Sequence, residues 1–259
     1  MSLDWPLILT YHHLDAHSHS RYVMRSDAFE RQLAGMLEHG FSAITLNEAL
    51  ATGPFGSGSA RSGSFTITFD DALASFGELA SPVLERLGLL GQTTMFVPTK
   101  WVGAHNDWLT SPTLLQRLVP WNDVDEAIMD WERIAQLAEA GVSVESHGHG
   151  HLALQKLTYD EALADATTSR DLLKQHGISA RYFALPYGWH SPESKRAIED
   201  AGFDAALSVK WGGHDRFEVR RIPVYGTDSA LTTRLKLSGR YFDAFDAAAA
   251  LAGKKKYRR

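Results

Sequence analysis

Two adjacent carboxylates directly follow a short apolar segment in the first third of the chain. Residues 65–69 have the β-branched and aromatic composition of a buried strand, and Asp70 and Asp71 come next. Sheets of α/β proteins usually carry their reactive groups at the carboxyl ends of strands. The position therefore indicates chemistry, although an Asp-Asp pair taken alone is also typical of a helix cap beside a solvated neighbour.

Three histidines in five residues follow a second predicted strand, at 142–145. They are His147, His149 and His151, and single glycines separate them. Glycine permits sharp backbone turns that would aim two imidazoles at one metal ion. A loop that is rich in histidine without any function is the alternative.

Together the two segments have the composition of a catalytic metal site. Two histidines and one carboxylate are the usual protein ligands of catalytic zinc, and they leave one position open for water or substrate. Asp71 would complete this set, and Asp70, aimed differently, would be free to take a proton from the bound water. The chain has no cysteine, which excludes thiolate ligands, disulfides and a cysteine nucleophile.

A third segment, at 182–188, reads as a strand that ends in a rigid turn. Pro186, Tyr187 and Gly188 form the turn. An ordinary strand exit would look the same, but beside the other two segments it becomes a candidate pocket wall. A backbone N–H near Tyr187 would then be placed to hold an oxyanion.

The elements that must position these residues alternate between short apolar runs and amphipathic helical stretches, which predicts βα units and a largely parallel sheet. Helices are expected at 27–39, capped by Ser26 and ended by Gly40, and from the capping box of Thr158 and Glu161 to His176. Eight short strands favour a barrel over two domains. The predicted strands are 7–10, 42–45, 65–69, 93–97, 142–145, 182–184, 205–208 and 219–224.

Composition sets the outer limits of the interpretation. With 259 residues, 44% of them hydrophobic, and a formal charge of -5, the chain predicts a folded protein without a nucleic-acid surface. No segment reaches the roughly 18 apolar residues of a membrane span, and the amino terminus does not resemble a signal peptide. As written, the protein is expected to be cytoplasmic, or exported if a native signal peptide has been removed. Its oligomeric state is left open.

The carboxylate pair, the histidine segment and the Pro-Tyr-Gly turn occur in this order along the chain, each at the end of a predicted strand. They resemble the motifs of the polysaccharide deacetylase family, also called NodB-like or carbohydrate esterase family 4. Residues 68–71 are similar to its T-F-D-D motif, 147–151 to its H-[ST]-x-x-H motif, and 183–188 to its F-A-x-P-Y-G motif. The resemblance implies a distorted (β/α) barrel of about seven strands. It would span a catalytic domain at 1–253, followed by a basic tail at 254–259.

The resemblance also implies roles for individual residues. Asp70 would be the general base, the backbone N–H of Tyr187 would serve the oxyanion, and an acetyl group would be removed from an N-acetylated sugar. The metal would be one divalent ion, with zinc favoured and cobalt, nickel or iron also fitting the ligands. The implied ligands are Asp71, His147 and His151, and the implied substrate contacts are Pro186, Trp211 and Arg221.

A general acid is implied at the first strand. Many members carry this histidine in a late L-x-H motif, which is absent here, whereas relatives that begin with a Tyr-His strand end supply it from the amino terminus. His12 takes this role by resemblance, and nearby carboxylates are expected to keep it protonated at neutral pH. His13 should point to the opposite face by the alternation of a strand.

Three residues depart from the family pattern. Ala72 replaces a usual glycine, and Gly148 replaces the hydroxyl residue of the second motif, which removes one hydrogen bond that would support the loop. Ala184 stands where many members carry an arginine that braces the base. Arg221 is a candidate substitute for this arginine, with a surface residue as the alternative, and His149 is assigned no ligand role.

Two other functions remain open at this point. The pair His147-x-His149 also occurs in other metal-dependent amidohydrolases of barrel fold, although there it normally ends the first strand. A carbohydrate-binding relative without catalysis would keep the fold, and the departures at Ala72 and Ala184 are compatible with it.

Overall fold

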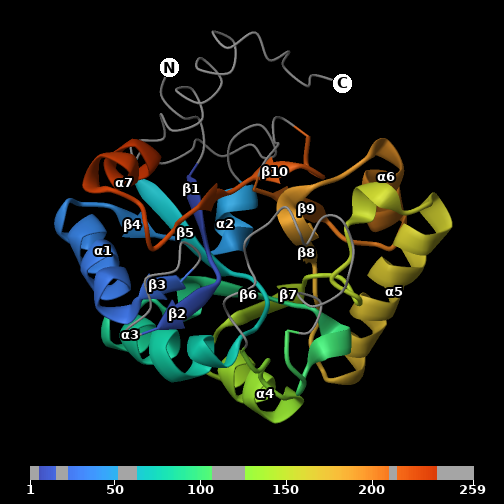
Figure 1. The fold of residues 1–259 in the computed structure, drawn as a ribbon, viewed down its shortest axis with the longest axis horizontal. Helices are drawn as coiled ribbons and strands as arrows, with labels where there is room; N and C mark the ends of the chain where they lie inside the picture. Colours follow the sequence, from blue (N-terminus) through green and yellow to red (C-terminus); the bar gives the residue numbers. More distant parts are fainter. Residues whose placement is uncertain (1–5, 16–22, 52–62, 107–125, 210–214, 238–259) are drawn as a thin grey trace, which may run out of the picture.

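Nine parallel strands form one sheet in the computed structural model, which describes residues 6–15, 23–51, 63–106, 126–209 and 215–237. Eight of these strands follow each other around the sheet in the order β10-β9-β8-β7-β6-β5-β1-β11, and helices lie outside them (Figure 1). The path comprises β1 (Leu7–Tyr11), β5 (Ser64–Phe69), β6 (Thr93–Val97), β7 (Ser143–Ser146), β8 (Tyr182–Ala184), β9 (Ala205–Ser208), β10 (Val219–Arg220) and β11 (Ile222–Pro223).

The remaining strands lie off this path. β4 (Ser42–Ala43) pairs with β5, while β2 (His13–Asp15) and β3 (Val23–Arg25) form a separate parallel pair. The expectation of a distorted (β/α) barrel is confirmed, with eight strands around a nearly closed sheet. The small sheet of β2 and β3 was not predicted.

The barrel closes at a single residue. β10 pairs with β9 at one end of the path and β11 pairs with β1 at the other, and only Arg221 separates β10 from β11. Its N–H donates to the carbonyl of Ser208 at 2.7 Å, and that of Val224 donates to the carbonyl of Thr10 at 2.9 Å. The strand predicted at 219–224 is therefore two short strands that join the two edges of the sheet.

The helices cover the outside of the barrel, and the starts of two of them can be compared with the predicted caps. The capping box of Thr158 and Glu161 begins α5 as predicted. Ser26 is not the cap of α1, because β3 runs straight into this helix and leaves Arg25 in the N-cap position. The helices are α1 (Ser26–Glu38), α2 (Leu46–Leu50), α3 (Ser81–Arg86), α4 (Trp131–Glu139), α5 (Tyr159–Gln175), α6 (Pro192–Asp200) and α7 (Ala230–Leu237).

An aromatic cluster packs beneath the first motif. Phe69, at the end of β5, stacks on Tyr11 at 5.3 Å and meets Phe76 edge to face at 4.8 Å between ring centroids. Phe29 from α1 completes the cluster and is fully buried. Burying each such side chain contributes roughly 2–3 kcal/mol, so the backbone that carries Asp70 starts from a rigid base.

A buried carboxylate aligns the two strands that lead to the second and third motifs. Glu145 Oε2, on β7, accepts hydrogen bonds from the N–H groups of Arg181 and Tyr182 at the start of β8, both at 2.7 Å. Burial raises the pKa of Glu145 to about 7. These bonds fix the register of β7 on β8, so the loops that follow the two strands emerge side by side.

No helix in the part of the chain that the structure describes is long and apolar enough to cross a membrane. The described residues do not include Trp211 or the basic tail at 254–259. Predictions that concern them stay predictions.

Candidate active site

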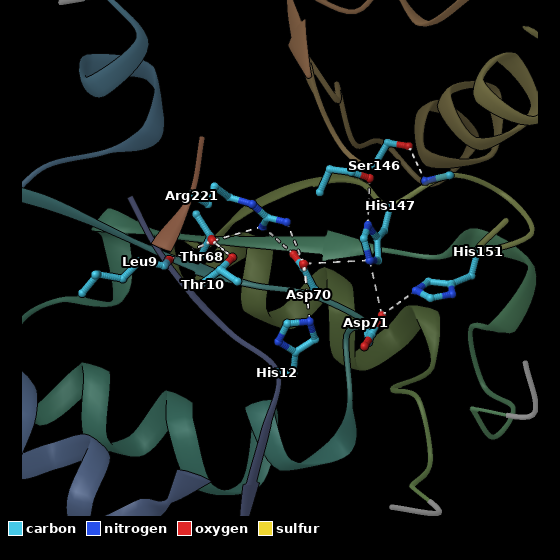
Figure 2. Close-up of polar contacts among 12 residues, drawn as sticks. Leu9, Thr10, His12, Thr68, Asp70, Asp71, Ser146, His147, His151 and Arg221 are labelled. Atoms are coloured by element: carbon cyan, nitrogen blue, oxygen red, sulfur yellow. Dashed lines mark hydrogen bonds and ion pairs between the residues drawn. The ribbon is translucent and has the colours of Figure 1, made fainter. Parts of the chain in front are cut away.

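The three predicted motifs follow strands of the same sheet at their carboxyl ends. Figure 2 shows the first two motifs together with His12 and Arg221. Asp70 and Asp71 follow β5, the histidine loop follows β7, and Tyr187 follows β8. His12 follows β1, and Arg221 reaches in from the point where the barrel closes. Parallel pairing thus brings together residues that are far apart in the sequence.

Three side chains form a cluster with the geometry of a metal site. Asp71 Oδ1 lies 3.4 Å from His147 Nε2 and 3.2 Å from His151 Nε2. One ligand atom of each lies within 4.8 Å of the others, and all three residues are buried. Zinc–ligand bonds of about 2.0–2.1 Å in a tetrahedron place ligand atoms about 3.4 Å apart. The donor set and its spacing therefore fit one divalent ion.

The electrostatics of the cluster suit a cation. Burial alone would raise the pKa of Asp71, but His147 and His151 outweigh it and hold the pKa well below its usual range. Burial lowers the pKa of His151, whereas Asp70 and Asp71 outweigh burial at His147 and raise its pKa. His147 Nδ1 donates to the carbonyl of Ala184 at 2.8 Å, which fixes the ring so that Nε2 faces Asp71.

The backbone at the site is held in an uncommon conformation. The four non-glycine residues with positive φ among those described are Asp71 (72°), Ala72 (53°), His151 (54°) and Tyr187 (62°). A left-handed conformation costs an alanine roughly 1–2 kcal/mol, which is a physical reason for the glycine that the family resemblance would place at residue 72. Each turn re-aims a ligand or a loop into the site.

Arg221 is the partner of Asp70. Its Nη1 and Nη2 donate to Asp70 Oδ1 and Oδ2 at 2.6 and 2.7 Å, and Nη1 also donates to Thr68 Oγ1 at 3.2 Å. Burial would raise the pKa of Asp70, but the charge of Arg221 outweighs it, helped by His147 and His12, and the pKa lies below its ordinary value. Asp70 is therefore ionised.

The burial of Arg221 decides between its predicted roles. The side chain is fully buried and lies over the ring of Phe96. The surface alternative is wrong, and a direct contact with substrate is not supported by this position. Arg221 instead takes the place next to Asp70 for which Ala184 offers no side chain.

His12 and His13 engage different partners, as the alternation predicts. His12 Nε2 lies 3.7 Å from Asp70 Oδ2, whereas His13 pairs with Glu126. The expectation that carboxylates keep His12 protonated is wrong for this structure. Burial is the largest influence and lowers the pKa of His12 despite the charges of Asp70 and Asp71, and the sequence alone does not reveal that burial.

The third motif packs on the second. The ring of Tyr187 lies edge to face on His151 at 5.0 Å between centroids, and Pro186 is buried beside it. His149 stands apart from the cluster of Asp71, His147 and His151, and its Nδ1 shares a hydrogen bond with Thr99 Oγ1 at 3.1 Å.

Sequence reasoning missed one residue at the site. Asp165, on α5, accepts hydrogen bonds from the backbone of the histidine loop. Its only signal in the sequence is an aspartate on the buried face of a helix, and that signal does not name a partner.

Comparison with known proteins agrees with this geometry. Residues 57–206 match the family model described as polysaccharide deacetylase. The chain belongs to the polysaccharide deacetylase family. The matched range contains the carboxylate pair, the histidine loop and the third motif, whereas His12 and Arg221 lie outside it.

Individual relatives of this deacetylase-family chain are distant in sequence. YxkH of Bacillus subtilis (strain 168), named as a predicted polysaccharide deacetylase, is 25% identical over 211 residues, which cover 81% of this chain and 66% of YxkH. The chain thus spans slightly less than two thirds of that relative.

Solved structures show the same fold. The deacetylase PplD of Streptococcus pyogenes, in complex with acetate, has a TM-score of 0.72 at 18% identity and covers 90% of this chain and 98% of its own. IcaB from Ammonifex degensii has a TM-score of 0.72 at 21% identity, and the match covers 93% of this chain and 98% of IcaB. The family and the fold confirm the resemblance and do not favour the other amidohydrolases.

We expect the histidines of the second motif to differ in metal retention. His147→Ala and His151→Ala should each lose the metal while the fold is kept, because each removes one of three clustered ligands. His149→Ala, the matched control, should retain it, because His149 bonds to Thr99 instead. Metal content by mass spectrometry and circular dichroism of the purified variants would check this, and a metal-free His149→Ala protein would contradict the assignment.

Proposed function

We propose that this protein hydrolyses the acetamide of an N-acetylated sugar or saccharide, with a divalent metal, zinc in the first place, held by Asp71, His147 and His151. The proposal rests on Asp70, which is ionised and paired with Arg221. The Oδ2 atom of Asp70 lies 3.9 Å from Nε2 of His147, one of the three clustered residues. A base beside an ion site is what amide hydrolysis by water needs. Family membership supports the same chemistry.

The metal, when bound, supplies a Lewis acid that polarises the acetyl carbonyl and acidifies water. Cobalt, nickel or iron would satisfy the same two imidazoles and one carboxylate. His147 and Asp71 are oriented in advance, the former by the carbonyl of Ala184 and the latter by its left-handed backbone.

Asp70 acts as the general base. Its Oδ2 faces both His12 and His147, and this oxygen takes the proton as water adds to the acetyl carbon. Arg221 holds both carboxylate oxygens, so the side chain cannot rotate away from the attacking water. The N–H of Tyr187 is assigned to the oxyanion that forms on the carbonyl oxygen.

His12 acts as the general acid. Because burial lowers its pKa, the resting imidazole is neutral and must first receive a proton. Asp70 Oδ2, 3.7 Å from His12 Nε2, is the nearest source of one, namely the proton taken from water. His12 then gives it to the sugar nitrogen as the carbon–nitrogen bond breaks, which releases acetate and a free amine.

Acetate release from a panel of N-acetylated substrates tests this function. The panel should include oligosaccharides, lipid-linked sugars and nucleotide sugars, with product mass reporting the loss of one acetyl group. We expect Asp70→Asn to keep the metal and lose activity by roughly two to four orders of magnitude, the usual contribution of a general base. Binding without turnover across the panel would favour a carbohydrate-binding relative, and near-normal turnover by Asp70→Asn would remove Asp70 from the mechanism.

His12 and His13 form a matched pair for the general acid. His12→Ala should retain metal and lose most deacetylase activity, because no other described histidine lies against Asp70 opposite His147. His13→Ala, which breaks the contact with Glu126 instead, should keep more activity. Steady-state kinetics with metal-saturated variants would show this, and the reverse order of activities would refute the assignment.

A further inference from the structure

Three consecutive residues of the histidine loop are held from two sides. The carbonyls of Gly148 and His149 accept from the N–H groups of Thr99 and Lys100 at 3.1 and 3.0 Å, and that of Gly150 accepts from Trp101 Nε1 at 3.2 Å. These donors all belong to one short helical segment after β6, Thr99–Trp101.

The opposite side of the loop is bonded by α5. Asp165 Oδ2 accepts from the N–H of His149 at 2.9 Å, and Oδ1 accepts from that of Gly150 at 2.7 Å. One turn further along the helix, Ser169 Oγ shares a hydrogen bond with Ser146 Oγ at 2.8 Å, and Ser146 Oγ accepts from the N–H of Gly148 at 3.1 Å. Every N–H and carbonyl between the two ligands His147 and His151 thus has a partner.

Of these contacts, those of Asp165 involve a buried carboxylate. The residue is 7% exposed, and a buried carboxylate is costly unless it is well hydrogen-bonded. A Cβ at Gly148, where φ is +75°, would stand 2.7 Å from Asp165 Oδ2. The glycine that replaces the hydroxyl residue of the motif therefore makes room for this carboxylate, which supplies the loop support that Gly148 lacks.

We propose that Asp165 is a positioning residue that sets the histidine loop in its metal-binding conformation before the ion arrives. The two bonds fix the backbone just before the left-handed turn at His151, and so the direction of its imidazole. Without these two hydrogen bonds, part of the free energy of metal binding would be used to order the loop, and the metal affinity would fall. This inference rests on the metal site of the proposed function and on no particular substrate.

The experiment measures the affinity of metal-free protein for Zn²⁺ in competition with a chromophoric chelator. Asp165→Asn keeps the shape of the side chain but turns one acceptor into a donor that faces an N–H. We expect it to weaken the Zn²⁺ Kd by roughly 10- to 100-fold, the usual effect of losing a residue that orients a ligand. Asp171→Asn, the same change at an exposed position of α5, should leave the Kd as in the wild type.

Two further measurements separate positioning from general stability. The melting temperature of the metal-free variants reports the structural part alone, and kcat of Asp165→Asn should return toward wild type when Zn²⁺ is saturating. Should Asp165→Asn not fold, Gly148→Ala disturbs the same contact from the loop and should weaken Zn²⁺ binding likewise. Equal Kd values for wild type and the variant would overturn the proposal, however far the melting temperature falls. Tight Zn²⁺ binding without deacetylation of any sugar would count against the proposed function alone.

Discussion

The paired hydrogen bonds between Arg221 and Asp70 are the interaction on which the rest of the site depends. Both groups are almost fully excluded from water, and an ion pair in such a place gains little net stability because desolvation offsets the attraction. Removing one partner would nevertheless cost roughly 3–5 kcal/mol, since the other charge would stay buried. We interpret the pair as a device that fixes the base rather than one that stabilises the fold.

The position of Arg221 couples this pair to closure of the barrel. Arg221 lies between β10, which pairs with β9, and β11, which pairs with β1. Asp70 follows β5, the other neighbour of β1. Asp70 and Arg221 can therefore meet only when the last short strands have joined the two edges of the sheet. The direct pairing of β1 with β5, in which Tyr11 lies opposite Phe69, brings His12 within reach of Asp70.

The features that could be predicted from the sequence are those that depend on residues close together in the chain. The strands, the capping box of α5 and the three motifs have short-range signals, and strand ends explain why the motifs converge. The partner of Asp70 lies 151 residues away. The sequence therefore offers Arg221 only as a candidate, with a surface residue as the alternative, and the folded chain is needed to decide between them. The lowered pKa of His12 and the support of the histidine loop by Asp165 depend on burial and on packing of one helix, which appear only in the folded chain.

The most direct test of the central claim is the pH dependence of kcat/KM for Arg221→Gln, with exposed Arg196→Gln as control. Arg221 holds the pKa of Asp70 low, so the wild type should lose activity only as the pH falls through that lowered value. In Arg221→Gln the pKa of Asp70 should rise, so the acidic loss of activity should begin at a higher pH. The rate should also fall roughly 100-fold because the base is misplaced, while the metal is retained. A variant that keeps the wild-type rate and acidic limb would contradict the account.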